Sequence, residues 1–272
     1  MSRLHWSSIG RSSVLPLMAG VLVGALILGW LGIPVVSSQG IFIRSYFVTD
    51  DFPLIPESSA WDKVPMIVIP LSGQLVTRPV WPDPSVPSLR VRSIHNGSEI
   101  AFFLEWQDNT KNDILSAGTF RDGVALGFPI GEAPAFFCMG QLDHYINIWH
   151  WKADWETDIE RRKKERDRRD RFEPIPRRVS SVEDLIGGGF STLTTKDTQG
   201  RVQGKARWKD GFWRVVMTRS LKLAEPGNEA RLDPGRIQVV SFAVWNGENK
   251  ERNGQKAVSP WFQLLIDPIT TL

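Results

Sequence analysis

The chain has 272 residues, with 33 basic and 30 acidic side chains, a formal net charge of +3 and a single cysteine, Cys138. This length allows one large β domain or two small ones with an ample core. The small net charge and the mixing of both signs argue against nucleic-acid binding. One cysteine excludes a disulfide framework, cysteine-based zinc and iron–sulfur sites, and covalent c-type haem attachment within this chain.

An uncharged and mostly apolar stretch covers residues 14–36. As a helix it would span roughly 35 Å, which exceeds a hydrocarbon core of about 30 Å. Arg3 and Arg11 precede it and acidic residues follow, so the positive-inside rule places residues 1–13 in the cytoplasm and the body outside. A cleaved signal peptide is the alternative, because Val36-Ser37-Ser38 resembles a cleavage site. The run is longer than a signal core of about 7–15 residues, which favours a single-pass anchor in the cell membrane.

The body beyond this stretch has the pattern of paired strands. Alternating apolar residues and turn dipeptides predict three features: a hairpin over 89–106 turning at Asn96-Gly97, a hairpin over 202–221 turning at Asp210-Gly211, and a strand over 237–245 ending at Asn246-Gly247. No long amphipathic helix separates these strands. We expect an all-β antiparallel sandwich over residues 59–272, joined to the anchor by a linker over 37–58.

Residues 156–171 form a segment of different character, with eight basic and six acidic side chains in sixteen positions. Such a composition predicts a short, solvated helical excursion between strands. A docking surface for a partner subunit is the alternative. Pro174 and Pro176 end the segment.

The sequence lacks the common catalytic motifs. No Gly-x-Ser-x-Gly elbow is present, and Gly187-Gly188-Gly189 lacks the Lys-Ser/Thr of a phosphate loop. His95, His144 and His150 match no zinc pattern. We therefore expect no catalytic site in this chain.

The segment around Met139 combines a thioether and a thiol with aromatic residues at a glycine-marked turn, in the sequence PAFFCMGQ (134–141). A thioether is a natural ligand for soft metals and haem iron. A single methionine is nevertheless far more often a filler of the core. The wider pattern of the chain has to decide between these roles.

Five blocks in order give that wider pattern. They are FLEWQDNT (103–110), DGVALGFP (122–129), FCMG (137–140), IWHWK (148–152) and FAVWNG (242–247), which continues through ERNGQKAVSPW (251–261). From about residue 60 to the C-terminus, the chain resembles the haem b-binding γ subunits of ethylbenzene dehydrogenase, dimethylsulfide dehydrogenase, selenate reductase and chlorate reductase.

The resemblance implies a sandwich similar to carbohydrate-binding modules, with one non-covalent haem b held by an axial Met/Lys pair. By position, the methionine is Met139 and the lysine is Lys256, although Lys250 and Lys152 lie in neighbouring blocks. Phe137 and Trp261 are expected to supply apolar walls.

The implied role is electron transfer, because two axial ligands leave no open position on the iron. The chain would relay electrons between the iron–sulfur β subunit of a complex, whose α subunit carries molybdopterin, and a soluble cytochrome c or similar carrier. The N-terminal anchor departs from the soluble members of the family and suggests a membrane-attached branch of the nitrite oxidoreductase-like type, with its globular domain on the periplasmic side.

Two other interpretations remain open. A tryptophan-rich sandwich without haem could bind carbohydrate by stacking sugars on exposed indoles. A purely structural subunit that tethers its partners to the membrane is the third.

Overall fold

The computed structural model describes residues 40–49, 52–131, 134–136, 138–168 and 178–270. The expected anchor at 14–36 and the N-terminal residues 1–13 lie outside these ranges. Within them, no helix combines the length and the apolar character needed to cross a bilayer.

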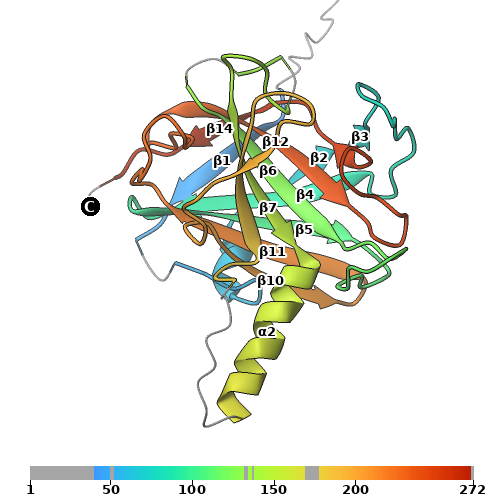
Figure 1. Cartoon of the computed structure of the whole chain (residues 1–272). Helices are drawn as coiled ribbons and strands as arrows, with labels where there is room; N and C mark the ends of the chain where they lie inside the picture. Colours follow the sequence, from blue (N-terminus) through green and yellow to red (C-terminus); the bar gives the residue numbers. More distant parts are fainter. Residues whose placement is uncertain (1–39, 50–51, 132–133, 137, 169–177, 271–272) are drawn as a thin grey trace, which may run out of the picture. The chain divides into compact units, whose positions relative to one another are not determined.

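Residues Ile41–Leu272 form one compact unit built almost entirely of strands (Figure 1). The strands are β1 (Phe42–Phe47), β2 (Ile67–Pro70), β3 (Ser72–Gly73), β4 (Ser88–His95), β5 (Glu99–Gln107), β6 (Gly123–Pro129), β7 (Ile146–Lys152), β8 (Val182–Gly187), β9 (Thr194–Thr195), β10 (Gln203–Lys209), β11 (Phe212–Ser220), β12 (Ile237–Trp245), β13 (Ala257–Val258) and β14 (Phe262–Ile266). A 3-10 turn, η1 (Ser59–Lys63), and one helix, α2 (Ala153–Arg168), complete the described elements.

The strands run in the order β10-β11-β5-β4-β1-β14-β12-β6-β7-β8-β9. Strand β12 belongs to both layers, because its first half pairs with β14 and its second half, Ser241 to Trp245, pairs with β6. The predicted sandwich is therefore closed on one side by a shared strand. Most pairs are antiparallel, as expected, but β1 runs parallel to both β4 and β14.

Large aromatic side chains fill the space between the two layers. Trp106 of β5, Trp213 of β11, and Trp149 and Trp151 of β7 are all buried there. The ring centroids of Trp151 and Trp213 are 5.0 Å apart in an edge-on arrangement. Since successive side chains of a strand point to opposite faces, His150 lies on the outer face of the same layer.

The three strand features predicted from the sequence are confirmed. The hairpin of β4 and β5 turns at Asn96, whose side-chain oxygen accepts hydrogen bonds from the backbone N–H groups of Ser98 and Glu99. The hairpin of β10 and β11 turns at Asp210 and Gly211, both at positive φ. Strand β12 has the expected bounds, Ile237–Trp245.

The segment 37–58 is not a linker throughout. Its residues Phe42–Phe47 form β1, which pairs with two other strands and buries Ile43 and Ser45 on alternate positions. The linker prediction missed this strand because β1 pairs with strands far away in sequence and has no hairpin turn of its own.

The charged segment is helical as predicted over its described residues, 156–168, and α2 projects from the body (Figure 1). Its first turn is tied down, since Glu156 is buried and accepts a hydrogen bond from the indole N–H of Trp151. Beyond this turn, Asp158 forms ion pairs with Arg161 and Arg162 on the helix surface.

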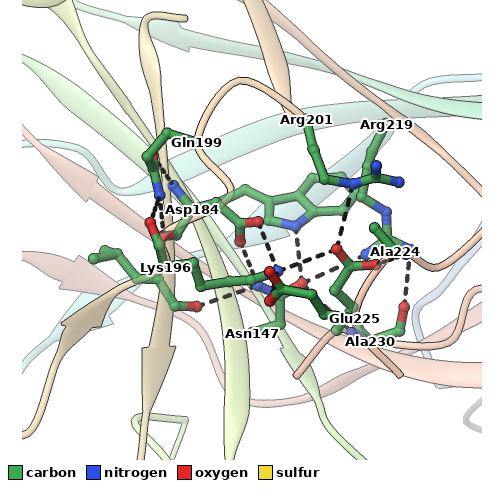
Figure 2. A network of polar contacts seen from close by, with 12 residues as sticks. Asn147, Asp184, Lys196, Gln199, Arg201, Arg219, Ala224, Glu225 and Ala230 are labelled. Atoms are coloured by element: carbon green, nitrogen blue, oxygen red, sulfur yellow. Dashed lines mark hydrogen bonds and ion pairs between the residues drawn. The ribbon is translucent and has the colours of Figure 1, made fainter. Parts of the chain in front are cut away.

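A network of polar and charged side chains, most of them buried, joins several strands (Figure 2). The Lys196 ammonium lies 3.1 Å from the Asp184 carboxylate and 3.2 Å from that of Glu229. Arg219 donates to the carbonyl of Ala230, and its guanidinium lies 5.1 Å from the centre of the Trp149 ring. These contacts join β8 and β11 to the segment that precedes β12.

Candidate functional site

The second half of β12 and strands β6, β7 and β8 form one layer, and along β6 and part of β12 its outer face carries small side chains. Gly123, Ala125 and Gly127 alternate along β6, and the paired positions on β12 include Ser241 and Ala243. A Cβ atom at Gly127 would lie only 2.8 Å from the Ser241 hydroxyl. Because these side chains are short, other segments of the chain can approach the backbone of β6 and β12 closely.

The loop that carries Met139 packs directly on this face. The Met139 carbonyl accepts a hydrogen bond from the backbone N–H of Gly189. Gly140 has a φ of +79°, and a Cβ atom there would lie 2.3 Å from the carbonyl oxygen of Gly187, so only glycine fits this turn. Met139 itself is half-buried. The backbone of this turn is thus fixed by close packing against Gly187 and Gly189.

Lys256 reaches the same place from the other end of the sequence. It precedes β13 and is 8% exposed, and its Nζ atom lies 3.4 Å from the Met139 sulfur and 4.9 Å from the centre of the Trp245 ring. Burial lowers the pKa of the Lys256 ammonium from 10.5 to about 8. No carboxylate of the described residues pairs with it. A buried amine without a counter-charge, next to a thioether, is an uncommon pair of donors.

Cys138 contributes packing rather than reactivity. Burial raises the pKa of its thiol to about 11, so the thiolate is scarce near neutral pH. The sulfur lies 3.7 Å from the carbonyl oxygen of Ser259. Cys138 is half-buried, and we interpret it as a side chain that packs against the segment around Ser259.

Trp245 and His150 form a wall beside the two donors. Their rings are stacked, with centroids 4.4 Å apart and an interplanar angle of 25°. The Trp245 indole N–H donates to the carbonyl of Asn253, which fixes the ring. Burial, followed by nearby cations, holds the pKa of His150 well below its usual range, so the imidazole is neutral.

The other residues predicted for the site lie in different surroundings from one another. The indole N–H of Trp261 donates to the carbonyl of Ala135, which braces the loop leading to Met139. Phe137 lies outside the described residues. Lys152 is engaged in an ion pair with Glu183 and lies 4.2 Å from the ring centre of Trp155, and Lys250 is exposed. Of the three candidate lysines, only Lys256 meets Met139.

Comparison with known proteins addresses the resemblance directly. The family model described as ethylbenzene dehydrogenase matches residues 58–173 and 175–257, which include Met139 and Lys256. The chain belongs to the ethylbenzene dehydrogenase γ-subunit family. This confirms the resemblance inferred from the sequence blocks.

Three relatives within this family have informative names. A protein of Haloferax mediterranei named as a respiratory nitrate reductase heme subunit is 31% identical over 81% of this chain and 71% of its own length. The chlorate reductase subunit gamma of Ideonella dechloratans is 30% identical over 77% and 78%. The dimethylsulfide dehydrogenase subunit gamma of Rhodovulum sulfidophilum is 26% identical over 84% and 78%.

Among solved structures, a family 9 carbohydrate-binding module from Caldicellulosiruptor kristjanssonii in complex with cellotriose is similar in fold. It has 10% identity and a TM-score of 0.46, and the match covers 84% of this chain and 95% of the module. A likeness this distant does not bear on ligand or function.

Proposed function

We propose that this chain is a haem-binding electron-transfer subunit of a molybdenum oxidoreductase complex. The observation that carries the proposal is the contact between the Lys256 amine and the Met139 thioether, 3.4 Å apart. Lys256 is buried, Met139 is half-buried, and no carboxylate of the described residues pairs with the amine. The names of the relatives support it, since one is called a heme subunit and two are gamma subunits of oxidoreductases.

The donor set fits haem iron. A thioether is a soft ligand of haem iron, and a lysine can ligate as the neutral amine. A lysine with the ordinary pKa of about 10.4 would cost roughly 4.6 kcal/mol to deprotonate at pH 7. With a pKa of about 8, the cost for Lys256 falls to about 1.4 kcal/mol, because burial has already disfavoured the ammonium.

The surrounding residues suit a flat, apolar macrocycle. The short side chains of Gly123, Ala125 and Ala243 would leave room for the macrocycle on the outer face. The stacked rings of Trp245 and His150 would supply an aromatic wall beside it. When bound, a b-type haem supplies reversible one-electron transfer. Met139 and Lys256 would hold the haem as its two protein ligands, and an iron with two protein ligands would have no position left for a substrate. The role proposed for the chain is therefore to carry electrons, not to catalyse.

The proposed partners follow from this role. Electrons would pass between an iron–sulfur β subunit, in a complex with a molybdopterin α subunit, and an external carrier such as a soluble cytochrome c. We further propose that residues 14–36 anchor the chain in the cell membrane with the body on the periplasmic side.

The test uses the full chain, produced with an adequate haem supply. Met139→Ala and Lys256→Ala are each expected to lose most of the bound haem or to shift its visible spectrum, since each removes one ligand. Met66→Ala and Lys250→Asn are matched controls, because Met66 and Lys250 are exposed and asparagine tolerates the positive φ of residue 250. A haem spectrum that is unchanged in both ligand variants would show that the assignment is wrong.

A further inference from the structure

A buried glutamine joins the loop that carries Lys256 to a second loop. Gln74 follows β3 and begins the 74–87 loop, which leads to β4, and the residue is 6% exposed. Its amide nitrogen donates to the carbonyl oxygen of Gly254 at 3.1 Å. Gly254 belongs to the loop between β12 and β13, residues 246–256, and precedes Lys256 by two positions. Gln74 therefore bonds to the backbone beside a proposed ligand without being part of the ligand pair.

Both ends of the Gln74 amide are in use. The oxygen accepts hydrogen bonds from the backbone N–H groups of Val76 at 2.6 Å and Thr77 at 2.7 Å. Besides Gly254, the nitrogen donates to the carbonyl oxygens of Thr77 at 2.9 Å and Pro79 at 3.4 Å. An amide combines an accepting oxygen with a donating NH2 group, whereas a carboxylate only accepts. A carboxylate at this position would have no hydrogen to donate to Gly254.

The backbone of Lys256 is held on both sides by two consecutive residues. On one side, Gln74 binds the carbonyl of Gly254. On the other side, Ala257 of β13 pairs with Gly73 of β3. A lysine side chain is long and flexible, so the position of its amine depends on the backbone from which it extends.

A second buried side chain crosses between the same two loops in the opposite direction. Glu251 lies in the 246–256 loop and is 1% exposed. Its carboxylate accepts from the indole N–H of Trp81 at 3.2 Å and from the backbone N–H of Ser85 at 3.1 Å, both in the 74–87 loop. It also accepts from the backbone N–H of Asn246 in its own loop at 3.0 Å. Each loop thus contributes one buried polar side chain that binds the other, and loss of either would leave buried groups without partners.

We propose that Gln74 is a positioning residue for Lys256, which holds the backbone of the 246–256 loop so that the Lys256 amine lies at the Met139 sulfur. The amine lies 3.4 Å from this sulfur, and no carboxylate of the described residues pairs with it. An ordered loop therefore has to do what a counter-charge would otherwise do. The consequence for haem rests on the proposed function: a ligand on an ordered backbone is already in place, so the cofactor is retained longer.

Hydrogen exchange of the full chain without haem tests the positioning directly. In Gln74→Met, the amides of residues 252–258 are expected to exchange about fivefold faster or more, the effect of roughly one lost hydrogen bond on the opening of a loop. Gln74→Glu, measured at pH 8, keeps the acceptor for Val76 and Thr77 but has no hydrogen for Gly254. It should show the same faster exchange at 252–258 while the amides of residues 76 and 77 stay protected. This second variant decides the question even if Gln74→Met fails to fold.

Haem release and the visible spectrum provide the second measurement, on chains produced with haem. Both Gln74 variants should release haem to excess apomyoglobin about fivefold faster or more than the wild type, for the same physical reason. Part of their spectrum should resemble that of Lys256→Ala, because the amine spends less time in its place.

Gln199 provides the matched control, because it braces a different loop in the same way. Its amide accepts from the backbone N–H of Asp184 at 3.1 Å and donates to the carbonyls of Asp184 and Lys196, both at 2.8 Å. Gln199→Met should lower the stability of the fold but leave exchange at 252–258, haem release and spectrum as in the wild type. A purely structural role of Gln74 would make the two glutamines behave alike.

Three results would overturn the proposal. The first is unchanged exchange at 252–258 in the Gln74 variants, and the second is unchanged haem release and spectrum in these variants of a wild type that binds haem. The third is an equal effect of Gln199→Met on the same measurements. A wild type without haem would contradict the proposed function instead, and the exchange measurement would still decide whether Gln74 holds the loop.

Discussion

At the scale of single residues, Lys196 is a buried cation surrounded by carboxylates. Its side chain is 2% exposed and lies among Asp184, Glu229 and, at 3.7 Å, Glu225. Lys196→Met would leave at least two buried carboxylates without their main partner. We expect the free energy of unfolding to fall by about 3–5 kcal/mol, measured by urea denaturation.

A matched lysine on the surface provides the control for this prediction. Lys209 pairs with Asp210 at 3.9 Å, but both side chains are mostly exposed. Lys209→Met should change the free energy of unfolding by less than about 1 kcal/mol. Equal effects of the two substitutions would mean that the network in Figure 2 does not stabilise the fold.

Some residues of the site could be predicted from the sequence alone, and others could not. Met139 and Lys256 stand 117 positions apart, and no local pattern indicates that they meet. Only the family resemblance selected them, since a lone methionine is usually core filler. Trp245 and His150 were not predicted as a wall, although their positions on the outward faces of β12 and β7 could have suggested it.

At the scale of elements, helix α2 separates into an anchored first turn and an outer part that is more exposed. Glu156 is 6% exposed, accepts from Trp151 and lies 3.8 Å from Lys205, whereas Lys163 and Lys164 are exposed. Glu156→Ala should destabilise the fold by about 1–3 kcal/mol, because it leaves a buried indole N–H without an acceptor. Thermal unfolding followed by circular dichroism measures this effect.

The outer half of α2 gives the contrasting expectation. Replacing Lys163 and Lys164 together by alanine should leave the free energy of unfolding within about 0.5 kcal/mol of the wild type. A large loss would contradict the interpretation of this half as a solvated helical excursion. An unchanged stability with weakened assembly would favour its alternative role as a docking surface.

Elements with local signals could be predicted, and elements defined by distant partners could not. The hairpins of β4–β5 and β10–β11 each contain their own turn dipeptide, which fixes both the turn and the pairing register. Strand β1 has no such turn, and it pairs in parallel with β4 and β14, which are far from it in sequence. The sequence pattern therefore predicts a linker for its six residues.

At the scale of the whole molecule, the sandwich could be predicted as a class but not as a topology. Period-two alternation and turn spacing indicate two packed sheets. That β12 contributes to both layers, and so places Trp245 and the following loop at the small-residue face, follows from long-range pairing. This shared strand is what brings Lys256 from the C-terminal part of the chain to Met139.

The central claim is that this fold holds one non-covalent haem through Met139 and Lys256. The most direct test is the visible spectrum and haem content of the full chain after haem-replete production, measured beside the Met139→Ala/Lys256→Ala double variant. The account predicts one b-type haem per wild-type chain, extractable by acidified organic solvent because only Cys138 is available for attachment, and little or none in the double variant. A wild-type chain without haem, or a double variant with the same haem content and spectrum, would contradict it.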